Sequence, residues 1–153
     1  MNRVSVTKAI ETGTWYECKW KHYDEEFHFR LRILGFNPTT VAEIDVSLID
    51  KVKIEGILWL ISIEVVNLNK QPFRPDVIPD SLMLMDEDGY QFEAFIANNL
   101  SFDEESGLLR FSVWPGSPSL SPKIKAIGTV AFVLPDEENN YYLMVKDGHI
   151  QEA

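Results

Sequence analysis

The chain has 153 residues, of which 45% are hydrophobic and 25% are charged. This size and composition are typical of one globular domain with its own core. The formal net charge is −10, which argues against nucleic acid as the main partner, because such binding draws on clustered Lys and Arg side chains. Cys18 is the single cysteine of the chain, so no disulfide can form within it.

The sequence shows no targeting or membrane segment. No apolar run of signal-peptide length follows a positive start, and the longest apolar run, 56–61, is far too short to span a bilayer. We therefore expect no membrane insertion. We expect a cytoplasmic location for the chain as written, or an extracellular or periplasmic one if it is a processed form.

The dominant period along the chain is two residues, which is typical of strands with one buried face. The clearest alternation runs over 27–33, where aromatic and aliphatic residues take every second position. Segment 57–66 is apolar on both faces at its start, which favours a central strand. Asp88-Gly89 between apolar segments predicts a hairpin, because Gly supplies the positive φ of such turns. The remaining segments that predict strands are 4–10, 41–48, 82–85, 90–94, 108–114, 126–134 and 141–145.

These short, turn-punctuated segments predict an all-β fold, an antiparallel β-sandwich of about nine strands with little helix. A helical period is weakly visible only over 49–54, which is too short to favour a stable helix. No repeat or linker divides the chain, so we expect a single domain over 1–153 whose last residues, 148–153, form a flexible tail.

The second half of the sequence carries a family resemblance. It contains Val65-Val66-Asn67 at a strand end, the apolar-x-Asp-x-x-Gly-aromatic-x-aromatic segment from Leu84 to Phe92, and Gly128 to Pro135 after a proline-marked approach. Over about 57–147 the chain resembles the immunoglobulin-like domains of unknown function that are typical of bacterial surface lipoproteins, which are related in fold to telokin-like secreted antigens. The resemblance implies an immunoglobulin-like sandwich and no chemistry. Residues 12–56 lie outside it and are expected to hold family-atypical strands.

The sequence holds no recognisable catalytic group. His22 and His28 flank acidic residues, but no second ligand cluster accompanies them, and His149 falls in the expected tail. Cys18 lies beside Lys19 and Lys21 without any thiol-protease signature. Serine-nucleophile and phosphate-loop motifs are also missing. We therefore expect neither an enzyme nor a cofactor.

Acidic clusters fall in predicted turns and raise the alternative of a calcium site. Asp86-x-Asp88-Gly89 resembles a fragment of a calcium loop, but aromatic residues stand where the later ligands would be. Asp86, Asp88, Asp136 and Glu137 are the candidate ligands. Solvated hairpin tips explain the same clusters without any metal.

An aromatic cluster gives the best functional hypothesis. Trp15, Tyr16, Trp20 and Tyr23 lie within nine residues, and aromatic side chains commonly anchor protein interfaces. On a strand, Trp15 and Trp20 point to opposite faces, so at least one should reach the surface. We expect a binding or assembly module that recognises a protein partner or a second copy through these residues. Packing of these aromatic residues in the core, a carbohydrate-binding sandwich, and an acidic inhibitor or immunity-type protein that masks a basic partner remain the alternatives.

Overall fold

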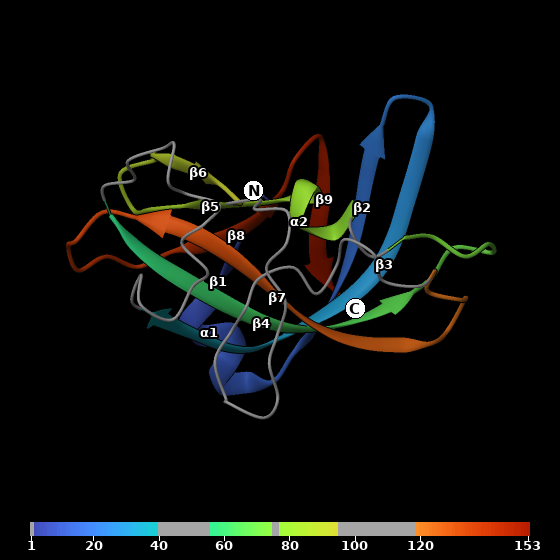
Figure 1. The fold of residues 1–153 in the computed structure, drawn as a ribbon, viewed down its shortest axis with the longest axis horizontal. Coiled ribbons are helices and arrows are strands. Elements are labelled where there is room, and N and C mark those ends of the chain that lie inside the picture. Colours follow the sequence, from blue (N-terminus) through green and yellow to red (C-terminus); the bar gives the residue numbers. More distant parts are fainter. Residues whose placement is uncertain (1, 40–55, 75–76, 95–118) are drawn as a thin grey trace, which may run out of the picture.

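The computed structural model describes residues 2–39, 56–74, 77–94 and 119–153, and in these ranges the chain forms two packed antiparallel β-sheets with two short helices (Figure 1). The expected β-sandwich is therefore confirmed. In chain order the elements are β1 (Val4–Ser5), α1 (Val6–Thr12), β2 (Trp15–His22), β3 (Glu25–Thr39), β4 (Ile57–Asn67), α2 (Val77–Ser81), β5 (Leu82–Met85), β6 (Gln91–Glu93), β7 (Lys125–Leu134), β8 (Tyr142–Val145) and β9 (Gly148–Glu152).

The strand order joins segments that are distant in sequence. One sheet has the order β1-β8-β5-β6 and the other the order β7-β4-β3-β2-β9. Strand β1 thus pairs with β8, and β2 with β9, so the two ends of the chain pair with each other in both sheets. Strand β4 lies between β3 and β7, which confirms the central position that its apolar sequence predicted.

The core fills the space between the sheets. The alternation over 27–33 is confirmed, because Phe27, Phe29, Leu31 and Ile33 are all buried. A shift of register between Ile33 and Gly35 then moves the following residues of β3 by one position against β4. The largest fully buried side chains come from both sheets and from α2: Phe29, Phe132, Leu31, Ile33, Ile61, Ile63, Ile78, Leu82, Leu84, Leu134 and Leu143.

The expected strand over 4–10 is wrong beyond its first two residues, because the chain turns into helix α1. The Ser5 side chain accepts a hydrogen bond from the backbone N–H of Lys8 (3.3 Å) and caps the helix. Gly13 ends it in the left-handed conformation (φ 64°), which Gly adopts without a steric cost. The helix buries Val6 and Ala9 with Ile10 packed against the core, a spacing that suits one helical face.

The expected flexible tail is also wrong. Residues 148–152 form β9, whose backbone pairs with β2 from Tyr16↔Glu152 to Trp20↔Gly148. Ile150 is buried between the sheets, and His149 lies on the strand beside Lys19. The short sequence looks polar because only one of its side chains faces the core.

Three predicted elements, the strands over 41–48 and 108–114 and the weak helix over 49–54, lie outside the described residues. The predicted hairpin over 82–94 is confirmed, with Leu84 opposite Phe92, and so are the strands over 126–134 and 141–145, as β7 and β8. Neither described helix is long and apolar enough to cross a bilayer.

Candidate functional site

The candidate site is the end of the hairpin formed by β2 and β3, which carries the aromatic cluster. The two strands pair from Trp15↔Arg32 to His22↔Glu25, and Tyr23 and Asp24 form the loop. In Figure 1 this hairpin (blue) rises away from the rest of its sheet. The neighbouring ladders with β9 and β4 stop at Trp20 and Phe29. Among the described residues, no other strand therefore pairs with the end of the hairpin between Trp20 and Phe29.

The four aromatic residues proposed from the sequence do not share one surface. Tyr16 and Trp20 face the core and are buried, whereas Trp15 lies half-buried on the outer face of the sheet. The Arg32 guanidinium lies over the Trp15 ring, 5.0 Å from its centre. Tyr23 projects from the hairpin loop. The two-residue period of the strand separates Trp15 from Trp20, as predicted, and this excludes a single flat platform made of all four.

Aromatic rings connect the exposed tip of the hairpin to the core. Tyr23 contacts His22 edge-on with 4.4 Å between ring centres, and His22 stacks on Trp20 at 4.8 Å. Trp20 in turn stacks on Phe27 at 5.4 Å, and Phe27 meets Phe73 at 5.8 Å. We call these five residues the aromatic row. The row supports the tip from below, so the position of Tyr23 is linked to the core through ring contacts.

Tyr23 itself has an unusual backbone. Its φ is 54°, and it occupies the first position of the two-residue loop. Hairpin loops with positive φ at this position generally have Gly, Asn or Asp there, because a bulky side chain in this conformation is strained. The Tyr23 side chain is nevertheless 86% exposed, so packing does not explain its presence. Lys123 and Asp147 are the other described residues with a positive φ that are not Gly, and of the three only Tyr23 is aromatic.

A hollow of about 610 Å³ lies beside the hairpin end. On one side it is lined by Glu25, Glu26 and Phe27, and on the other by residues 69–74, with Val77 and Ser119 completing the lining. Phe27 and Phe73 are buried and contribute only the edges of their rings to this lining, and carboxylates from β3 and cations from the loop after β4 lie around them.

The loop after β4 is held in place by one buried amide. The Nδ2 of Asn67 donates to the carbonyl oxygens of Gln71 (3.0 Å) and Leu120 (2.8 Å), and its Oδ1 accepts from the N–H of Asn69 (2.7 Å). Asn69 Oδ1 in turn accepts from the backbone N–H of His28 (3.0 Å). The loop that lines the hollow is therefore tied to the hairpin. Sequence reasoning missed this loop and Phe73, because only the folded chain brings them to the hairpin.

Cys18, the candidate nucleophile, and His28 both lie against neighbouring side chains. Cys18 is buried between the sheets, and burial raises the pKa of its thiol far above the usual range, with Glu17 adding to the effect. Such a thiol is protonated and unreactive. His28 pairs with the Glu17 carboxylate. Within the described ranges, no three His, Cys, Asp or Glu side chains come together as metal ligands.

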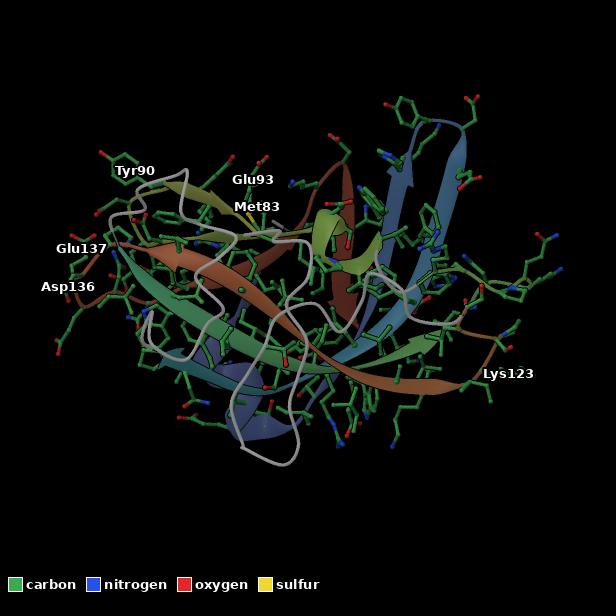
Figure 2. The ribbon with its side chains drawn as sticks, in the orientation of Figure 1. Met83, Tyr90, Glu93, Lys123, Asp136 and Glu137 are labelled. Carbon is green, nitrogen blue, oxygen red and sulfur yellow. The ribbon has the colours of Figure 1, made fainter. Side chains whose placement is uncertain are left out.

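The four candidate calcium ligands lie in two neighbouring turns, but their carboxylates do not come together around one point. Asn140 Nδ2 donates to Glu87 Oε1 (2.7 Å) and joins the turn after β5 to the turn after β7. Asp86 is buried, and its Oδ1 accepts from the backbone N–H groups of Asp88 and Tyr90, both at 2.9 Å. Figure 2 shows Asp136 and Glu137 at the end of the molecule, and both are exposed, as is Asp88. The carboxylate of Asp86 thus caps its own turn.

Comparison with known proteins bears on the fold alone. No protein-family model and no curated protein matches the sequence. Among solved structures, MPT63, a secreted protein from Mycobacterium tuberculosis, is similar with a TM-score of 0.53 and 10% identity over 90% of this chain and 92% of MPT63. A conserved hypothetical protein from Bacillus anthracis has a TM-score of 0.43 and 13% identity over 91% of this chain and 96% of its own. The chain therefore has a mostly β, two-sheet sandwich fold similar to that of MPT63.

Proposed function

We propose that this protein is a non-catalytic binding module that recognises a protein partner through the end of the β2–β3 hairpin. The exposed Tyr23 carries this proposal. Its side chain stands in solvent at a backbone conformation that favours Gly, on a tip that the aromatic row supports. Tyr is among the residues most enriched in the energetic centres of protein interfaces.

The neighbouring hollow supports a protein partner over a carbohydrate. Its apolar lining consists of Val77 and the edges of the buried Phe27 and Phe73 rings, with acidic residues on one side and Lys70 on the other. A polypeptide segment can place an apolar side chain and both kinds of charge there. We further propose that the chain belongs with the immunoglobulin-like domains of bacterial surface lipoproteins, to which its second half has a sequence resemblance.

Replacement of Tyr23 by Gly separates recognition from folding. Gly relieves the positive φ, so Tyr23→Gly should leave thermal stability unchanged or slightly raised, while the loss of the ring should remove partner capture. The matched control is Tyr90→Gly, which removes another exposed Tyr from a different hairpin (Figure 2).

The assay is capture from native lysate followed by titration with the purified partner. Wild type and Tyr90→Gly should retain the same partner, and Tyr23→Gly should lose it while melting normally. Retention of that partner by Tyr23→Gly would reject the hairpin tip as the binding site.

A further inference from the structure

The outer face of the five-stranded sheet is cationic although the chain as a whole is strongly acidic. The strand register places Trp15, Arg32, Glu64 and Ile127 in one row across β2, β3, β4 and β7. The next row holds Glu17, Arg30, Val66 and Lys125, and Lys19 follows beside His28. We call the surface defined by Trp15, Lys19, Arg30, Arg32, Lys125 and Ile127 the cationic face.

The two carboxylates of these rows already have partners on the face. Glu64 is buried and accepts from Arg32 Nη2 at 2.9 Å, with Lys125 Nζ at 3.8 Å. Glu17 pairs with His28. With Lys21 opposite Glu26 in the following row, five Lys and Arg cations of the described residues face three carboxylates. Lys19 and Arg30 are exposed and have no carboxylate partner among the described residues.

The surplus of positive charge is local. The chain carries a formal charge of −10, and the acidic turn with Asp136 and Glu137 lies at the opposite end of the long axis from Lys123, which precedes β7 (Figure 2). Side chains of one sign gathered on one face produce a local potential that selects partners of the opposite sign.

The cationic face also exposes apolar surface. Ile127 lies in the row of Glu64 and is 63% exposed, and Trp15 in the same row is half-buried beneath Arg32. Ile124, just before β7, is exposed as well. Aliphatic side chains beside exposed cations are typical of a surface that binds polypeptide, because a phosphate backbone offers nothing for Ile to contact.

We propose that the cationic face docks an acidic segment of a partner protein. Its carboxylates pair with Lys19, Arg30 and Lys125, and an apolar side chain covers Ile127. Arg30 and Lys125 lie two strands apart, roughly 10 Å, so carboxylates at a similar separation would reach both. This surface is distinct from the hairpin tip of the proposed function, because its side chains point away from the core whereas the aromatic row runs into it.

The probe is a short fluorescein-labelled peptide of alternating Glu and Val, read by fluorescence anisotropy at low and high salt. A peptide with Lys in place of Glu and a single-stranded DNA oligonucleotide serve as comparisons. We expect the acidic peptide to bind, and its binding to weaken as salt rises. The doubly reversed variant Lys19→Glu/Arg30→Glu should lose about tenfold or more in affinity.

The matched control is Lys8→Glu at an exposed position outside both the face and the hollow, and it is compared with the single variant Lys19→Glu, which changes the net charge equally. Lys8→Glu should bind nearly as wild type does. Ile127→Ser should weaken binding without changing its salt dependence. Thermal melts establish that each variant folds, and Arg30→Gln replaces the double variant if that one does not.

Four results would overturn the proposal. They are no binding of the acidic peptide, equal or tighter binding of the DNA, equal loss in the control variant, and a salt-sensitive dimer that Lys19→Glu/Arg30→Glu dissolves. The last result would make a second copy of the chain the occupant of the face.

Discussion

Substitution of Gly148 by Ala tests how closely the last strand is packed on β2. A Cβ at this position would lie 2.9 Å from the carbonyl carbon of Lys19 and 3.1 Å from the Cα of Trp20, and it would overlap the Lys19 carbonyl oxygen. Carbon atoms that are not bonded prefer 3.5–4.0 Å. Strands β2 and β9 would therefore have to separate by roughly 1 Å at this end.

A separation of this size has a calculable cost. Backbone hydrogen bonds contribute about 1 kcal/mol each, and the pairs at Gly148 and His149 are the first to open. Trp20, which is buried beneath this pairing, would gain exposure as well. We expect Gly148→Ala to lower the free energy of unfolding by about 2–4 kcal/mol, a large part of the stability of a domain of this size.

Urea unfolding measures the loss, and amide hydrogen exchange locates it. The control is Gly35→Ala, whose new Cβ would meet only the Asn37 side-chain nitrogen at 3.3 Å and whose φ suits any residue. Faster exchange should be confined to β9 and the facing part of β2. If Gly148→Ala unfolds at the same urea concentration as Gly35→Ala, with unchanged exchange in β9, the close approach does not exist.

Three further predictions concern the thiol and the acidic turns. Because the buried Cys18 thiol stays protonated while the unfolded thiol ionises, the unfolded state binds fewer protons and stability should fall above about pH 8.5, by at most about 1.4 kcal/mol per pH unit. Cys18→Val should reduce this slope, and an unchanged slope would contradict it. Asp86→Ala should cost about 1–2 kcal/mol because the N–H groups of Asp88 and Tyr90 lose their acceptor, whereas Asp86→Asn, which keeps an acceptor oxygen, should cost less in the same urea titration. Millimolar calcium should leave the melting temperature unchanged, and a rise that a chelator reverses would restore the calcium alternative.

The parts of the fold that follow from local pattern could be predicted from the sequence. Strand β3 alternates strictly over 27–33, so its buried face could be predicted. Strand β4 is apolar on both faces because strands flank it on both sides. Helix α1 was missed because Val4 and Val6 also fit a two-residue period. Its end signals, Ser5 and Gly13, distinguish the two cases, since a capping hydroxyl and a left-handed Gly enclose one short helix.

Strand β9 shows what a local pattern cannot supply. Only Ile150 marks a buried face, and the strand exists because β2, near the other end of the chain, offers it hydrogen bonds. The candidate site likewise has a part that a local pattern predicts and a part that it does not. Alternation separated Trp15 from Trp20, but the contact of Phe27 with Phe73 depends on a loop that Asn67 holds in place, which no short window of sequence reveals.

The pairing of the two chain ends constrains when this protein can fold during synthesis. Strand β2 is made early, yet its outer neighbour β9 consists of residues 148–152, and β1 waits likewise for β8. The backbone N–H of Ala153 donates to the Trp15 carbonyl oxygen at 3.0 Å and extends this pairing to the start of β2. Because β1 and β2 gain these partners only after the long intervening sequence has been made, each has an unpaired edge during that interval, and completion of both sheets depends on contacts that are distant in sequence.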